Sequence, residues 1–505
     1  GGGGGRPRAR QGKFVTSAES RSSWGWMDEL NFVARTPVYK PAVSKTTAVA
    51  LDHDSSLGVP LLLGQPATGG TDLKHRPSSS GRKRLTNAEA IYTIVNIFVG
   101  LGMLSKPYSV AQGGWVSLVG LTVLCFWGAI SGLIMIRCFQ LVPGSRVTYP
   151  ELGYAAMGVF GRRMVQTIII LEFMGATLIV MIFMWKNFMF LFSDVDSFSA
   201  AAGLTLAAVP SVWLLNFGDL SFISFLGVLA NAAIMVAVVG FLIANPSQIE
   251  PSKYDWSTDW DGFSISMGIY TVALAGHAAL PSVYADMQDK DSIDVVVIVS
   301  FVIMWLIYCI TATAGYLYHG RHAHVLVTED IMLTSPGWCF QMVTFLVVAK
   351  SYCSVSPIVA ILNEIPEAGL GVVSEWTRRC SRTVCLLVLS LVAYACQDHL
   401  GFVEAVTGSA FTMASSFILP PLFLVLLSYK KTNRQEPAGI LGTPLGKGIK
   451  QTMAWVAKFN VYDRAYYWFL VFSGIIVGIV FTYGDIRELF NDHEAAVGGS
   501  TTGTS

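Results

Sequence analysis

The stretch Asn96–Tyr108 reads NIFVGLGMLSKPY. Gly100 and Gly102 precede Pro107 in the middle of an otherwise apolar run. Both residue types weaken a helix interior, glycine through its backbone freedom and proline through its missing N–H. We therefore predict that a membrane-spanning helix is interrupted at this point.

A second stretch with the same pattern, Thr271–Pro281, reads TVALAGHAALP and contains Gly276 and Pro281. It lies five predicted spans further along the chain. Interrupted helices at corresponding places in two halves of a membrane protein indicate a transporter site built on inverted repeats. A glycine stretch taken alone is better explained by close helix packing. The match in register between the two stretches favours the site.

Composition places most of the chain in a membrane, because 53% of its residues are hydrophobic, only 13% are charged, and the mean hydropathy is +0.53. A helix needs roughly 20 apolar residues to cross the hydrocarbon. About eleven stretches qualify, and the alternating pattern of a β-barrel is absent. We predict an all-α membrane protein with spans near 87–111, 114–138, 163–192, 201–217, 219–243, 262–287, 292–318, 337–361, 380–397, 401–428 and 463–484.

The distribution of Lys and Arg predicts orientation, since basic loops stay on the cytosolic side. Basic clusters precede span 1 and follow spans 2, 8 and 10, which places the N-terminus in the cytosol. We expect a disordered cytosolic tail over 1–84, a transmembrane domain over 85–490 and a disordered tail over 491–505. The net charge of +1 gives no electrostatic field that favours nucleic acid, which is therefore not an expected partner. The apolar spans make the lipid bilayer an expected partner.

An interrupted helix exposes peptide N–H groups and carbonyls that a zwitterion can bind. We expect the amides of Gly102, Met103 and Leu104 to hold a carboxylate, and the carbonyls of Leu274 and Ala275 to accept from an ammonium group. An α-amino acid carries both groups. The predicted substrate-binding residues are Asn96, Gly100, Gly102, Met103, Leu104, Thr271, Leu274, Ala275, Gly276 and His277.

Ionisable residues inside spans are costly, and this makes them candidates for function. Lys350 lies near the middle of span 8, and Glu172 lies well inside span 3. We predict that both take part in proton coupling, with a permanent ion pair between them as the alternative. His277 either has a functional role, in contacting substrate or sensing pH, or only holds the break in span 6 open. Glu89 is set aside, because Thr86 and Glu89 fit a capping box at the start of span 1.

Three stretches resemble the amino acid/auxin permease family, and most closely its vesicular and vacuolar branch. They are VGLGMLSKPYSVAQGGW (Val99–Trp115), GHAALPSVYADM (Gly276–Met287) and SVSPIVAILNEIP (Ser354–Pro366). The resemblance implies a leucine-transporter-like fold of five-plus-five inverted repeats, with transport coupled to protons or sodium. It also implies that span 8 faces span 1 near Lys350, where sodium-coupled relatives bind a cation. Lys106 departs from the pattern, because such proteins usually have a small or apolar residue there.

Other classes of protein fit less well. A receptor has fewer spans, and a channel filter usually needs a charged ring or repeated pore loops, which the sequence lacks. No GxSxG, HExxH or Walker motif suggests an enzyme, a nucleotide site or a cofactor. The 8 cysteines show no metal-ligand spacing, so no metal site is predicted. We predict a secondary active amino acid transporter, proton-coupled and in an endomembrane such as the vacuole, with sodium-coupled symport as the alternative.

Overall fold

The fold is taken from a computed structural model of the chain. It describes residues 1–2, 85–142, 148–213, 231–237, 239–241, 243–244, 251–334, 337–369, 374–433 and 461–501. The chain divides into two units, 1–37 and 38–505, and only Gly1 and Gly2 of the first are described. The predicted tail over 1–84 and most of the predicted span 219–243 therefore lie outside the described residues.

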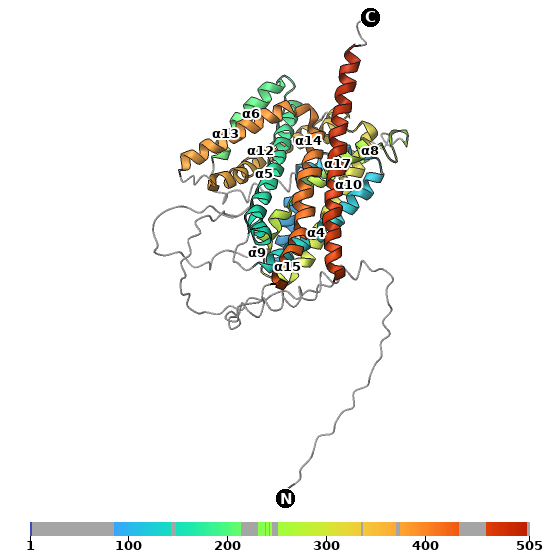
Figure 1. The fold of residues 1–505 in the computed structure, drawn as a ribbon. Coiled ribbons are helices and arrows are strands. Elements are labelled where there is room, and N and C mark those ends of the chain that lie inside the picture. The colour runs from blue at the N-terminus through green and yellow to red at the C-terminus, as the bar shows by residue number, and fades with distance from the viewer. Residues whose placement is uncertain are drawn as a thin grey trace. The chain divides into compact units, whose positions relative to one another are not determined.

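The described part of the second unit is almost entirely helical. Its longer helices are α2 (Asn87–Phe98), α3 (Lys106–Gly113), α4 (Val116–Leu141), α5 (Tyr149–Leu191), α6 (Ser197–Val212), α8 (Trp260–Val272), α9 (Leu280–Asp286), α10 (Ile293–His319), α11 (Val327–Thr334), α12 (Trp338–Gly369), α13 (Glu375–Ala395), α14 (Leu400–Val406), the π-helix η9 (Thr407–Ile418), α15 (Leu419–Asn433) and α17 (Val461–Thr501). In Figure 1, α4, α5, α15 and the red helix α17 run side by side, and α6, α12 and α13 pack against α5.

Seven helical segments among the described residues are long and apolar enough to cross a membrane. They are Val116–Leu141, Tyr149–Leu191, Trp260–Asp286, Lys290–His322, Phe340–Asn363, Gln397–Tyr429 and Val461–Phe490. An intra-helical hydrogen-bond ladder satisfies the backbone in lipid, which is why apolar runs of this length fold as helices. The prediction of a multi-pass helical membrane protein is confirmed, while the count of eleven spans stays a prediction.

Spans 1 and 6 are both interrupted at the predicted places. α2 ends at Phe98, and the short 3₁₀ turn η1 (Leu101–Met103) separates it from α3. α8 ends at Val272, and the turn η5 (His277–Ala279) separates it from α9. Gly276 has φ 158°, and a side chain there would press on the Phe98 ring. The predicted capping box is also confirmed, since the Glu89 amide donates to Thr86 Oγ1 at 3.3 Å and the Thr86 amide donates to Glu89 Oε2 at 2.8 Å.

The two interrupted spans run antiparallel and are joined at both ends. The Leu85 amide donates to the Asp286 carbonyl, and the Gln288 amide donates to the Leu85 carbonyl, each at 2.9 Å. At the other end, the Trp115 amide donates to the Asp255 carbonyl at 3.2 Å. The start of span 1 is therefore fixed to the end of span 6, and its end to the start of span 6. This pairing brings the two breaks to the same depth.

Several boundaries differ from those predicted, among them the start of α5 and the ends of α4 and α17. α5 begins at Tyr149 rather than near 163, because Gly158 (φ 70°) kinks the helix instead of ending it. α4 runs to Leu141 rather than 138, and Arg137 within it is buried, with Nη2 2.6 Å from Oδ2 of Asp294. α17 continues to Thr501, so the backbone is helical past 490, where the sequence suggested a disordered tail.

The interrupted span 6 packs unusually closely against span 10. A Cβ added to Gly408 would collide with the Gly268 carbonyl and the Val272 amide, and one added to Gly268 would lie 2.5 Å from the Ala405 carbonyl oxygen. Backbone atoms of spans 6 and 10 are in direct contact here, so neither span can make room by changing a side-chain rotamer. Glycines at such crossings allow membrane helices to approach this closely.

Gly408→Ala should therefore destabilise the protein by roughly 1–3 kcal/mol, the cost of forcing a methyl group into a filled space. Thermal unfolding of the purified chain in detergent measures this. The matched control is Gly203→Ala in α6, where an added Cβ would meet nothing within 4 Å. Equal loss of stability in both variants would contradict the close approach.

Candidate substrate-binding site

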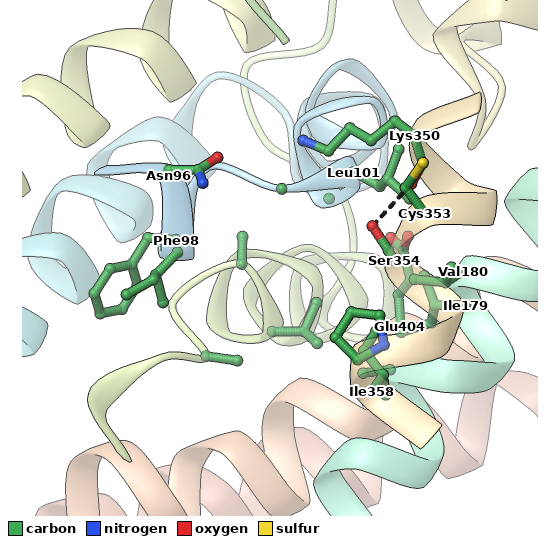
Figure 2. Close-up of a pocket in the computed structure, with 18 of the residues that line it drawn as sticks. Asn96, Phe98, Leu101, Ile179, Val180, Lys350, Cys353, Ser354, Ile358 and Glu404 are labelled. Carbon is green, nitrogen blue, oxygen red and sulfur yellow. Dashed lines mark hydrogen bonds between the residues drawn. The ribbon is translucent and has the colours of Figure 1, made fainter. Parts of the chain in front are cut away.

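A cavity of about 360 Å³ lies where the two breaks face spans 3, 8 and 10. Figure 2 shows that its wall comes from several elements, with Asn96 and Leu101 on span 1, Ile179 on α5 and Lys350 on α12. Glu404 reaches it from α14. The volume is at the lower end of the range for small-molecule pockets. The cavity therefore has the size of a site for one small metabolite.

Half of the predicted site residues line this cavity. The lining ones are Asn96, Gly100, Gly102, Ala275, Glu172 and Lys350. The others flank the breaks without lining the cavity: Met103, Leu104, Thr271, Leu274, Gly276 and His277. They pack against other parts of the protein, because only some positions of a short turn can be directed toward the cavity. The Thr271 hydroxyl, for example, donates back to the Met267 carbonyl at 2.7 Å.

Some of the peptide groups expected to bind substrate are already engaged. The Met103 amide donates to the Gly100 carbonyl at 3.3 Å, and the Leu104 amide donates to the Leu101 carbonyl at 2.9 Å. These bonds form because the broken segment closes into a 3₁₀ turn instead of remaining fully open. A carboxylate role for these amides stays a prediction. Gly100, Leu101 and Gly102 line the cavity at the first break, and Ala273 and Ala275 line it at the second.

Tyr308 on α10 bridges the two breaks. Its buried hydroxyl lies 2.7 Å from the Phe98 carbonyl oxygen and 2.9 Å from the Ala273 carbonyl oxygen. These are the carbonyls that the ends of α2 and α8 leave without intrahelical partners. The side-chain amide of Asn231 donates in a similar way to the Val99 carbonyl. Sequence analysis missed both residues, since neither is charged and neither is near the breaks in sequence.

Tyr308→Phe should loosen the link between the two breaks, because the Ala273 carbonyl loses the hydroxyl donor, while the Phe98 carbonyl keeps only the Gly100 amide at 2.8 Å. Losing a partner of a buried polar group costs about 1–3 kcal/mol, which corresponds to substrate binding weaker by roughly 5-fold to 150-fold. Substrate binding to the purified protein measures this. Tyr318→Phe is the control, since that hydroxyl contacts Thr334 Oγ1 at 2.7 Å, away from the breaks. Similar loss of affinity in both variants would contradict the bridging role.

Lys350 and Glu172 both line the cavity, from α12 and α5. In Figure 2 the Lys350 side chain reaches from α12 toward the interrupted first span. Within the part of the chain that the structure describes, no ion pair joins Lys350 to a carboxylate. Glu172 is 7% exposed, and its Oε1 has no hydrogen-bond partner among those residues. The contacts therefore do not support the alternative of a permanent Lys350–Glu172 pair.

Glu404 is the main residue that sequence analysis missed. It is fully buried, its Oε1 accepts from the Ser105 hydroxyl at 2.9 Å, and its Oε2 has no hydrogen-bond partner among the described residues. It lies only four positions into the predicted span 401–428, where a carboxylate suggests a membrane interface. The available signal was that this glutamate precedes a stretch rich in Ser, Thr and Ala (Thr407–Ile418), whose small side chains allow helices to pack closely.

Lys106, which departs from the family pattern, does not point into the cavity. It is fully buried behind the break, where Nζ donates to the Ile269 carbonyl at 2.9 Å. Nζ also lies 5.4 Å from the ring centres of Tyr270 and Tyr308, within cation–π range. It attracts Glu404 electrostatically. Lys106 thus balances a buried carboxylate and cross-links span 1 to span 6.

His277 has the contacts of a structural residue. Its Nε2 lies 2.9 Å from the Gly128 carbonyl oxygen and its Nδ1 lies 3.3 Å from the Leu274 carbonyl oxygen. The ring is 1% exposed and packs among Phe98, Phe301 and Phe417. Of the two interpretations left open by the sequence, the one in which His277 holds the break in span 6 agrees with these contacts.

A helical membrane protein with two antiparallel, interrupted spans around one charged cavity has the architecture of a secondary carrier. A family profile described as "Transmembrane amino acid transporter protein" matches residues 83–440. The chain belongs to this family, and the resemblance to the amino acid/auxin permeases is confirmed.

Individual relatives agree with this assignment. Amino acid transporter AVT1D of Arabidopsis thaliana is 29% identical over 371 residues, which are 69% of this chain and 65% of that protein's length. The vesicular inhibitory amino acid transporter of Xenopus tropicalis is 23% identical over 402 residues, 73% of this chain and 76% of that protein. The crystal structure of MhsT with L-phenylalanine matches with a TM-score of 0.50 at 12% identity, covering 80% of this chain and all (100%) of that one. The relatives are named as transporters and not as enzymes.

Proposed function

We propose that this protein is a secondary active transporter that moves amino acids across a membrane, with proton movement as the driving reaction. The observation that carries the proposal is the cavity between two interrupted spans, which combines peptide groups, two buried carboxylates and one ammonium group. Family membership supports the amino acid as substrate. Sodium-coupled symport is the alternative for the driving ion.

The cavity supports a neutral amino acid as the substrate class. Ile97 and Phe98 on span 1, Ile179 on α5 and Leu346 and Ile358 on α12 form an apolar wall. Such a wall suits an aliphatic or aromatic side chain, because burying apolar area contributes about 25 cal/mol per Å². Two carboxylates, those of Glu172 and Glu404, and one ammonium group, that of Lys350, line the cavity. Lys106 adds a second ammonium group, buried behind the break in span 1. A zwitterion adds no net charge to this set.

Glu404 is the group we assign to the substrate ammonium, together with the Ala275 carbonyl predicted from the sequence. Its Oε1 is held by Ser105, so the second oxygen has a fixed direction while lacking a partner of its own. A buried carboxylate oxygen without a donor is costly, and an ammonium group supplies one. The substrate carboxylate is assigned to the region of Gly100 and Gly102, where glycines allow close approach to the backbone.

Lys350 is the group we assign to the proton. It lines the same cavity, and no carboxylate among the described residues holds it as a permanent cation. A lysine side chain withdrawn from water can be either charged or neutral. A residue that couples proton movement to transport must be able to adopt both states. Protonation next to span 1 would change the field at the substrate site. This gives proton and substrate a physical reason to affect each other's binding.

Uptake into reconstituted vesicles tests the function. The purified chain is incorporated into liposomes, a pH gradient is imposed, and a panel of labelled amino acids is supplied with and without sodium. Gradient-dependent, saturable uptake without sodium supports the proposal, whereas uptake that needs sodium supports the alternative. Conductance far above the turnover of a carrier, or no uptake of any amino acid, would overturn it.

We also propose an endomembrane location with the N-terminus in the cytosol. The basic clusters that follow spans 2, 8 and 10 support this orientation. The similarity to the vesicular inhibitory amino acid transporter of Xenopus tropicalis supports the location by analogy. Protease protection of an N-terminal epitope in isolated organelles tests both. A protected epitope in intact vacuoles or vesicles would reverse the orientation.

A further inference from the structure

A compact group of metal-ligating side chains lies outside the cavity, where α10 ends and α11 begins. His319 is the last residue of α10, His324 lies in the connection, and Asp330 is in α11. Their donor atoms all lie within 4.8 Å of one another. His324 Nδ1 is 2.6 Å and His319 Nδ1 is 3.4 Å from the same oxygen, Oδ1 of Asp330. Three ligands therefore converge on one small volume.

The group is partly enclosed and is not a loose surface cluster. Asp330 is 1% exposed, and its two oxygens accept from the His324 amide at 3.0 and 3.3 Å. The Nε2 of His319 is buried and has no hydrogen-bond partner among the described residues. Nε2 of His319 thus lacks the hydrogen bond that would normally fix the ring, whereas the Asp330 carboxylate is held by the His324 amide. Glu329 adds a second carboxylate, 4.0 Å from His324 Nε2.

We propose that His319, His324 and Asp330 bind a divalent transition-metal ion, with Zn²⁺ as the best match. Two imidazole nitrogens and one carboxylate oxygen are a zinc donor set, whereas Mg²⁺ and Ca²⁺ prefer oxygen ligands. Ligand atoms about 2.0–2.2 Å from one tetrahedral ion lie roughly 3.3–3.6 Å apart. His324 Nδ1 would therefore exchange its hydrogen bond to Asp330 Oδ1 for a metal bond and move away from that oxygen by roughly 1 Å, whereas His319 Nδ1 already lies at a suitable distance from it. Three protein ligands leave a position for water, which favours exchangeable binding.

A metal ion bound by His319, His324 and Asp330 would affect the candidate substrate-binding site. α11 begins at Val327, whose amide donates to the Leu104 carbonyl at 3.3 Å, in the break of span 1. An ion shared by the end of α10 and by α11 fixes α11 against that break. Bound metal should therefore stabilise this arrangement and slow any movement of the broken segment. The metal site does not depend on the proposed transport function.

Zinc binding to the full chain tests the proposal directly. The protein is purified in detergent without a polyhistidine tag, stripped with a chelator and titrated with Zn²⁺ by calorimetry. Co²⁺ replaces Zn²⁺ for visible absorption, which reports coordination geometry. We expect one Zn²⁺ per chain, no competition by Mg²⁺, and a rise in the unfolding temperature with added Zn²⁺.

Variants separate the site from adventitious binding. His324→Asn and, independently, Asp330→Asn should weaken Zn²⁺ binding at least as much as the roughly 10-fold to 100-fold typical of losing a supporting partner. His322→Asn is the matched control, because His322 is exposed and outside the cluster. The unfolding temperature without metal checks that each variant is folded. Wild-type protein that binds no Zn²⁺, or equal losses in the cluster variants and in His322→Asn, would overturn the site.

Discussion

Lys350→Ala is expected to abolish proton-driven amino acid uptake while the protein stays folded. The lysine lines the cavity from α12, and no carboxylate among the described residues pairs with it. If its protonation drives transport, its removal unlinks substrate movement from proton movement, so the imposed pH gradient should no longer cause accumulation above equilibration. Initial uptake rates at several imposed pH gradients measure the loss.

A charge-preserving substitution distinguishes coupling from a structural role. Lys350→Arg keeps the positive charge, but a guanidinium does not release its proton in proteins. We expect this variant to lose gradient-driven uptake and to retain exchange of labelled for unlabelled substrate. Lys186→Ala is the matched control, because that partly exposed lysine on α5 lies 3.9 Å from Asp398 and outside the cavity. Normal pH dependence in Lys350→Ala would contradict the assignment.

Glu404→Gln is expected to weaken substrate affinity strongly. The change keeps the shape of the side chain and its Ser105 contact while removing the charge offered to the substrate ammonium. A hydrogen bond to a charged group is worth about 1.5–3 kcal/mol, so the dissociation constant should rise by roughly 10-fold to 150-fold. Equilibrium binding of labelled amino acid to the purified protein measures this, independently of the driving ion.

Two further variants sharpen the Glu404 experiment. Glu375→Gln removes a carboxylate whose side chain is 72% exposed at the start of α13, and it should leave affinity unchanged. Ser105→Ala keeps the Glu404 charge but removes the hydroxyl that orients it, so a smaller loss is expected. Unchanged affinity in Glu404→Gln, with the protein folded, would remove Glu404 from the substrate site.

The sequence predicted best the features that depend on a residue and its immediate neighbours along the chain. Gly100, Gly102 and Gly276 marked the breaks, because backbone freedom depends on the residue itself and hardly on its distant neighbours. The Thr86 capping box was predictable for the same reason. Lys350 was found because a lysine deep in an apolar run needs an explanation wherever it lies.

Sequence reasoning was weakest on which side chains face the cavity. His277 and Leu104 are next to the breaks in sequence but are buried in protein. Glu404 lines the cavity, although it looked like a residue at the end of a span. The direction of a side chain in a short turn depends on a few degrees of backbone rotation, and the packing of other helices sets that rotation.

Residue patterns along the chain were enough to predict that it folds as membrane helices, that two of them are interrupted, and that it belongs with the amino acid transporters. How the interruptions are satisfied depends on the packing of distant helices. Tyr308 bonds to both breaks across the chain, and Ser105 holds Glu404 from 299 positions away. The reason is physical: hydropathy and backbone freedom belong to single residues, whereas a hydrogen bond between distant helices exists only after they have packed together.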